Sequence, residues 1–259
     1  MNTHALLRGL AKFYPKKIAK KHHDFVGLMC GKLKEETNRI LLCLDFDETI
    51  LNKVEVEKYD LIITHHPFIY GQKRYVLKFD EHKRRLFEKM LEIDVPIYSF
   101  HTNFDEGKKG MNDALASLLM LNNIYSPAEM PMMRIGTLSE SMEVHEFAKY
   151  AIEKLNVPYG ALIDEGKSTI LKVGVIGGGG SRDYKIAKEL GCDIYISGDV
   201  PHHVRRDIII DKFNYLDVPH EVENVFMVQM KKTLLDLDDQ LIIDTIVHEV
   251  PPKIYKLSK

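Results

Sequence analysis

The sequence predicts an α/β fold, a two-lobed protomer with mainly parallel sheets flanked by helices. Three short apolar runs, residues 39–44, 60–64 and 95–99, have the continuous hydrophobicity of strands buried on both faces. Charged segments with helical spacing, such as residues 80–92, separate these runs. Strands that alternate with helices form βαβ units, whose strands pair in parallel. The chain has 259 residues and is 45% hydrophobic, which is enough for two lobes.

The first lobe is expected over residues 1–125. It opens with a helix that Thr3 caps and Pro15 ends. The apolar positions of this helix follow helical spacing: Leu6, Leu7, Leu10 and Phe13. After the three strands, a helix is expected over residues 112–120.

The second lobe is expected over residues 126–216. Prolines and methionines between residues 122 and 134 interrupt the alternation and predict a lobe boundary there. A helix should follow, with these residues on one face: Val144, Phe147, Ala148, Ala151, Ile152 and Leu155. Strands are expected at 171–176, 193–197 and 215–218. A helix from Glu223 to about Leu234 and a strand at 241–248 complete the chain, and this C-terminal segment, about 217–259, is expected to pack back on the first lobe.

The composition excludes several classes of protein to which this chain could belong. A formal net charge of −2 gives no general basic field for nucleic acid. The locally basic stretch from Lys12 to Lys21 is interpreted as a solvated helix end. The three cysteines form no CxxC pair, so neither a disulfide framework nor a thiolate zinc site is indicated. No apolar run has the length of a membrane span, and we expect a cytoplasmic protein.

Histidines and acidic residues stand directly after three of the expected strands, or in the first turn of the helix that follows the strand. His65 and His66 come directly after the strand at 60–64, and Pro67 enforces a turn in which both can converge. His101 and Asp105 are four residues apart, and His220 and Glu223 are three apart, spacings that put each pair on one side of a helical turn.

These three sets predict a dinuclear metal centre. Ligands collect beyond the carboxyl ends of strands in open α/β sheets, where each set begins. A carboxylate can bridge two cations, and neutral imidazoles can complete their coordination. Two metals that share a water would lower its pKa from ~15.7 toward ~7. For Asp105 alone, the competing interpretation is a helix cap.

Two further segments are candidates for roles near the same sheet edge. Residues 197–203 contain Asp199, His202 and His203, which are interpreted as groups that orient ligands or carry protons. The glycines at 177–180 follow a strand and precede a helix. Their amides are suited either to a phosphate or to a tight turn with close backbone approach.

A rival interpretation concerns Asp45 and Asp47. Residues 44–50, Leu-Asp-Phe-Asp-Glu-Thr-Ile, resemble the DxDxT signature of haloacid dehalogenase-like phosphatases. That resemblance would make Asp45 the nucleophile, Asp47 the acid/base and Asp199 a magnesium ligand. It leaves the three histidine sets without a role, and Asp47 also suits a helix cap.

Four ordered motifs, Thr64-His65-His66-Pro67, residues 101–105, Ser197-Gly198-Asp199 and the segment from His220 to Glu223, resemble the GTP cyclohydrolase I type 2 homolog family, the NIF-three-like proteins. The resemblance covers nearly the whole chain. It includes Gly27-Leu28, Arg134-Ile135-Gly136 and the glycines from 177.

The resemblance implies a toroidal homohexamer of two-lobed protomers with two divalent metals, zinc, iron or manganese, in each. Its metal ligands would be His65, His66, Asp105, His220 and Glu223, with Glu223 bridging. The named activity converts GTP and water to formate and 7,8-dihydroneopterin triphosphate. His101 or His203 would then carry protons during opening of the purine ring.

The last motif departs from its common form. Asn224 stands where many members have the glutamate, so Glu223 is assigned on the three-residue spacing, with Glu221 as the alternative, and Pro219 replaces a glycine. Two other functions stay open: another metal-dependent hydrolase acting on a nucleotide or phosphoester, and a non-catalytic ring that binds metal or partner proteins.

Overall fold

The computed structural model describes residues 1–255, which form two compact units. Unit 1 comprises residues 1–111 and 224–248. Unit 2 comprises residues 112–223 and residues 249–255. Each unit is built around one sheet with helices on it, so the α/β fold class predicted from the sequence is confirmed.

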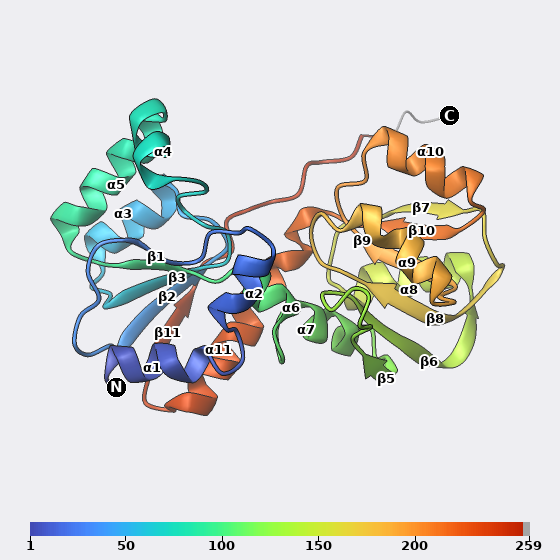
Figure 1. Cartoon of the computed structure of the whole chain (residues 1–259), viewed down its shortest axis with the longest axis horizontal. Helices are drawn as coiled ribbons and strands as arrows, with labels where there is room; N and C mark the ends of the chain where they lie inside the picture. Colours follow the sequence, from blue (N-terminus) through green and yellow to red (C-terminus); the bar gives the residue numbers. More distant parts are fainter. Residues whose placement is uncertain (256–259) are drawn as a thin grey trace. The chain divides into compact units, whose positions relative to one another are not determined.

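The sheet of unit 1 has the strand order β1-β4-β3-β2-β11. Its strands β2, β3, β4 and β11 are parallel, and β1 is added antiparallel to β4. In Figure 1, α3 and α5 lie on one face of this sheet, and α1 and α11 lie on the other. The bounds of the strands are β1 (Gly27–Cys30), β2 (Arg39–Cys43), β3 (Leu61–Thr64), β4 (Ile97–Ser99) and β11 (Ile242–Thr245). The bounds of the helices are α1 (Thr3–Leu10), α2 (Lys16–Lys21), α3 (Glu48–Val56), α4 (Lys73–Phe79), α5 (Glu81–Ile93), α6 (Thr102–Glu106) and α11 (Val225–Leu237).

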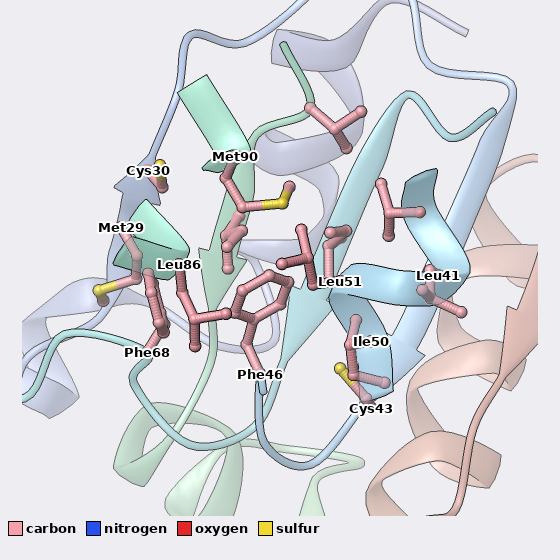
Figure 2. Packing of buried hydrophobic residues seen from close by; sticks show 14 of the residues in the cluster. Met29, Cys30, Leu41, Cys43, Phe46, Ile50, Leu51, Phe68, Leu86 and Met90 are labelled. Atoms are coloured by element: carbon pink, nitrogen blue, oxygen red, sulfur yellow. The ribbon is translucent and has the colours of Figure 1, made fainter. Parts of the chain in front are cut away.

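One face of this sheet carries a continuous apolar core. Leu41 and Cys43 of β2 alternate with residues that point the other way, as in any strand. They pack with Ile50 of α3 and with Leu86 and Met90 of α5, all buried (Figure 2). This packing makes the carboxyl ends of β2, β3 and β4 a rigid edge on which side chains can be positioned.

The sheet of unit 2 has the strand order β5-β6-β8-β9-β10-β7. It is mixed rather than mainly parallel, because the parallel strands β8, β9 and β10 are extended by antiparallel strands on both sides. The strand bounds are β5 (Asn122–Tyr125), β6 (Arg134–Glu143), β7 (Ala161–Asp164), β8 (Thr169–Val175), β9 (Ile194–Ser197) and β10 (Asn214–Asp217). The helix bounds are α7 (Met111–Leu118), α8 (Val144–Lys154), η1 (Ser181–Asp183), α9 (Tyr184–Glu189), α10 (His202–Ile210) and η2 (His220–Asn224). Tyr195 and Tyr215 of the sheet pack against α9 and α10.

The strands and helices expected from periodicity are present within a few residues, with one correction at the N-terminus. Asn2, not Thr3, caps α1, and its side chain accepts a hydrogen bond from the Ala5 amide at 3.0 Å. Thr3 is unsuited to capping because its buried hydroxyl is hydrogen-bonded to that of Thr37, at 2.8 Å. The helix ends at Leu10, well before Pro15.

The units divide the chain at positions other than the predicted lobe limits. The passage into unit 2 falls at residue 112, ahead of the predicted boundary at residue 125. The start of the predicted boundary segment, residues 122–125, instead forms β5, which pairs with β6 in the sheet of unit 2. Unit 2 extends to residue 223, and α11 and β11 belong to unit 1. Across residues 1–255, no helix is long and apolar enough to cross a membrane.

Candidate metal centre

In unit 1, three neighbouring parallel strands end at the same level of the sheet. Cys43 of β2 pairs with Thr64 of β3, and Thr64 pairs with Ser99 of β4. Two residues beyond these positions stand Asp45, His66 and His101. The strand register alone therefore brings side chains from distant parts of the sequence to one edge, where α/β sheets bind ligands.

The turn after β3 makes both of its histidines face the same place. The Thr64 hydroxyl bonds the His66 carbonyl at 2.8 Å, which closes the turn, and it also contacts the Ser99 hydroxyl. The His65 and His66 rings are 5.0 Å apart between centroids. One ring nitrogen from each of His65, His66 and His101 lies within 4.8 Å of the others. The predicted convergence of these side chains is therefore present.

Each of these three rings is oriented through Nδ1. His65 Nδ1 is 2.9 Å from the Phe100 carbonyl, which only accepts hydrogen bonds, so this nitrogen carries the proton. His66 Nδ1 is 2.8 Å from Asp45 Oδ2, and His101 Nδ1 is 2.8 Å from Asp24 Oδ2. With the proton on Nδ1, the lone pair is on Nε2, the arrangement that metal-ligating histidines require.

Asp105 joins this group through the helix that His101 begins. His101 precedes α6, and its carbonyl accepts a hydrogen bond from the Asp105 amide at 3.0 Å. One helical turn therefore puts both side chains on one side. Asp105 Oδ1 lies 3.5 Å from His65 Nε2, and both residues are buried. A carboxylate that faces an imidazole nitrogen in this way is a suitable donor pair for a divalent cation.

Asp24 holds His101 in place and is itself fixed. Its Oδ2 accepts hydrogen bonds from His101 Nδ1 and from the hydroxyl of Thr102, at 2.7 Å for the latter. Burial alone would raise the pKa of Asp24, but these hydrogen bonds lower it to about 2. Asp24 is thus ionised at neutral pH, and its carboxylate fixes the His101 ring. No pattern in the sequence indicates Asp24, because it lies between α2 and β1 in a segment without periodicity.

In unit 2, a histidine near the carboxyl ends of β8, β9 and β10 is also oriented by a carboxylate at Nδ1. Asp199 follows β9, and His220 begins η2 after β10. His220 Nδ1 is 2.5 Å from Asp199 Oδ2, and its Nε2 is 3.1 Å from Glu223 Oε2. Glu223 raises the pKa of His220 to about 9, against the effect of burial, and Asp199 adds to the rise. A metal ion could replace the proton held between His220 and Glu223.

The structure favours Glu223 over Glu221 as the partner of His220. Glu223 is 4% exposed, and the three-residue spacing within η2 turns it toward the histidine. In the described residues, Glu221 makes no ion pair with His220. Asp199 was expected to orient a ligand, and its contact with Nδ1 of His220 has that geometry. His203 is exposed in the first turn of α10.

The glycine segment at residues 177–180 forms a tight turn against Glu223. Gly178 has a φ of +60°, and a Cβ at this position would overlap Glu223 Oε1. Its carbonyl accepts hydrogen bonds from the Gly198 amide at 2.7 Å and from the Ser197 hydroxyl at 2.9 Å. Of the two roles considered for these glycines, the structure supports close backbone approach.

Asp45 and Asp47 have contacts that differ from those of a phosphatase motif. Burial alone would raise the pKa of Asp45, but its hydrogen bond with His66 and the nearby charges lower it. The Asp47 side chain caps α3 by accepting from the amides of Thr49 and Ile50, at 2.8 and 3.3 Å. The capping role considered for Asp47 is confirmed, and Asp45 orients one of the clustered histidines.

Comparison with known proteins identifies the family of this chain. A sequence profile of Duf34/NIF3 (NGG1p interacting factor 3) matches residues 1–253. A GTP cyclohydrolase 1 type 2 homolog from Clostridium perfringens is 31% identical over 207 residues, 78% of this chain and 79% of that protein. A homolog of the same name from Methanocaldococcus jannaschii is 29% identical over 251 residues, 93% and 98% of the two chains.

A solved structure agrees with the fold. The Bacillus cereus protein related to NIF3 superposes with a TM-score of 0.85 at 22% identity, over 99% of each chain. Since the family profile spans nearly all of the sequence and the fold matches a protein related to NIF3, this chain belongs to the Duf34/NIF3 family.

Proposed function

We propose that this protein binds two divalent metal ions and uses them in a hydrolytic reaction, with GTP as the substrate to test first. The ligands in this proposal are His65, His66, Asp105, His220 and Glu223, with Glu223 bridging. The observation that carries it is the shared orientation of the histidines: each has Nδ1 on an oxygen acceptor and presents Nε2. Histidines that bind metals are usually held in this way, with the nitrogen that does not bind the metal donating to an oxygen acceptor.

The chain's own residues fit the chemistry of such a centre. Bound metals would lower the pKa of a water and polarise the substrate. His101 is close to His65 and His66, and Asp24 fixes its ring, so it is placed to accept and return a proton. His203 is a second proton carrier in the proposal. The donor set of imidazoles and carboxylates suits zinc, iron or manganese, and availability would decide among them.

The GTP reaction is proposed because the relatives from Clostridium perfringens and Methanocaldococcus jannaschii carry the name GTP cyclohydrolase 1 type 2 homolog. The overall change would be GTP and water to formate and 7,8-dihydroneopterin triphosphate. Assembly as a toroidal homohexamer is part of the same proposal, and a mass of six chains by light scattering would support it. A mass of one or two chains would contradict it.

The test compares metal content and formate release in wild type, Glu223→Ala and Glu221→Ala. Glu221 is the matched control, since it lies two residues away and makes no ion pair with His220 among the described residues. We expect about two metals per chain in wild type and in Glu221→Ala, with a loss in Glu223→Ala. Metal without formate from GTP would contradict the cyclohydrolase reaction and favour a different hydrolase or a metal-binding ring. Wild type without metal would contradict the whole proposal.

A further inference from the structure

A hollow in unit 1 lies next to the histidine cluster but contains none of its proposed ligands. Its volume is about 310 Å³, and it is formed by α2, β1 and the segments before β1 and α4. Ligand pockets for small molecules start at about this size. Three lysines, Lys16, Lys20 and Lys73, line it together with apolar side chains that include Phe25 and Leu28.

The lysines give this hollow a local positive charge in a chain whose net charge is −2. Lys16 and Lys20 are four residues apart, so they share one face of α2 although like charges at this spacing destabilise a helix. Among the described residues, neither they nor Lys73 form an ion pair with a carboxylate. Lys21, on the same helix, does pair with Glu106, at 3.6 Å.

Aromatic rings rather than acids hold two of the three ammonium groups. Lys16 Nζ lies 5.3 Å from the centre of the Tyr98 ring, and Lys73 Nζ lies 5.1 Å from that of Phe87. Gly27 makes room for the first, because a Cβ there would come within 2.6 Å of Lys16 Nζ. A cation over a ring face retains N–H groups that can donate to a ligand.

The carboxylate in the lining does not cancel this charge. Asp24 is the acidic residue among those that line the hollow, and its side chain is 3% exposed. Its Oδ2 already accepts hydrogen bonds from His101 and Thr102. Three lysines therefore line the hollow against one carboxylate, and the Oδ2 atom of that carboxylate already accepts from other donors.

We propose that this hollow binds a small phosphorylated molecule with a flat apolar body. The phosphate would be held by Lys16, Lys20 and Lys73, because lysine binds phosphate as a point charge and needs no paired geometry. The apolar body would cover Phe25 and Leu28, which are 37% and 40% exposed. The volume fits a single ring with its phosphate better than a larger ligand. This site is additional to the proposed metal centre and does not depend on it.

The test uses phenyl phosphate as the probe and isothermal titration calorimetry on the full chain after treatment with a chelator. Phenol and inorganic phosphate supply the two halves of the probe separately. We expect saturable binding of phenyl phosphate and at least tenfold weaker binding of each half. Lys16→Gln and Lys73→Gln should each weaken binding by roughly three- to tenfold. Lys17→Gln is the matched control, because Lys17 is exposed on the same helix and does not line the hollow.

Several results would overturn the proposal. Phenol that binds as tightly as phenyl phosphate would leave the hollow as an apolar site, and equal binding of inorganic phosphate would remove the apolar body from the argument. Unchanged affinity in both lysine variants would place the probe elsewhere. Binding that appears only after metal is added would assign the phosphate to the metal centre. If the protein binds no metal but still binds phenyl phosphate through the lysines, the proposed function would be contradicted and the proposal for the hollow would stand.

Discussion

Four of the described histidines make the same type of contact although they come from three separate segments. His65, His66, His101 and His220 each place Nδ1 within hydrogen-bond distance of a carbonyl or carboxylate oxygen. Such a contact fixes the ring and selects one tautomer. The energetic consequence is that each imidazole is already oriented, so less conformational entropy would be lost if a metal ion bound.

Asp45 provides a direct test of this orientation. Asp45→Ala should weaken metal binding by about 10- to 100-fold, because His66 loses the acceptor that fixes its ring. The change itself should be tolerated by the fold, since the Asp45 side chain is 48% exposed. Metal affinity is measured by competition with a chelator of known affinity.

Asp47→Ala is the matched control for Asp45→Ala. Asp47 caps α3, so its loss should lower the free energy of unfolding by about 1 kcal/mol and leave metal affinity unchanged. Full metal affinity in Asp45→Ala, combined with loss of a phosphatase activity, would support the rival phosphatase interpretation instead.

Gly178 is a second residue whose side chain, here a single hydrogen atom, affects the position of a proposed ligand, Glu223. In Gly178→Ala the new Cβ would overlap Glu223 Oε1, and the backbone φ of +60° would disfavour alanine. We expect loss of bound metal together with a decrease in stability of about 1 kcal/mol or more. Metal analysis and thermal unfolding measure the two effects.

Gly179→Ala is the control at the neighbouring residue. A Cβ at Gly179 would meet Asp199 Oδ2 at 3.6 Å, an ordinary contact. Metal content should therefore remain at the wild-type value. If Gly178→Ala also retains it, the approach of Gly178 to Glu223 does not determine the position of that carboxylate.

At the scale of elements, periodicity was sufficient to predict most of the strands that carry the site. The run that became β3 is apolar throughout and ends at His65, so both the strand and its functional end are visible in the sequence. Asp24 is different, because its partner His101 is 77 residues away and no local pattern links them. Pairing across a sheet edge depends on the strand order, which the sequence pattern does not specify. The mixed sheet of unit 2 was missed for the same reason.

The start of β9 offers a prediction on stability and pH. Buried Asp193 accepts hydrogen bonds from Lys167 Nζ at 2.6 Å and from the amides of Leu171 and Lys172 at 3.0 and 2.8 Å. Burial raises the pKa of Asp193, but these donors outweigh it and hold the pKa below the ordinary value of 3.8. A depressed pKa in the folded state stabilises the protein above the unfolded pKa, and this contribution is lost as pH falls through the folded value.

Asp193→Asn should therefore be less stable than wild type at neutral pH, by on the order of 2 kcal/mol. The difference should shrink as the pH falls below about 4, as urea unfolding at several pH values would measure. Lys167→Ala should cost less than about 1 kcal/mol, because the Lys167 side chain is 71% exposed. A difference that stays constant down to pH 2 would show that Asp193 charge does not contribute.

On the scale of the whole molecule, the two units have the same arrangement of strand ends and histidines. Each sheet presents the carboxyl ends of three consecutive parallel strands, and each edge holds an imidazole oriented by a carboxylate. In unit 1 the strands are β2, β3 and β4, and in unit 2 they are β8, β9 and β10. The rigid cores behind these edges keep the donors in position, as precise ligand geometry requires.

In the proposed function, the ligands from both units act as one dinuclear centre. His65, His66 and Asp105 are separated in sequence from His220 and Glu223 by more than a hundred residues, and Glu223 is the proposed bridge. Two ions that share a carboxylate lie roughly 3.5–4 Å apart, close enough for exchange coupling. Protein loaded with two Mn²⁺ per chain should therefore give a spin-coupled electron paramagnetic resonance spectrum. Glu223→Ala should lose the coupling, whereas Glu221→Ala should retain it. Two uncoupled six-line signals in wild type would mean that the two ligand sets bind metals independently, and the single-centre proposal would then be wrong.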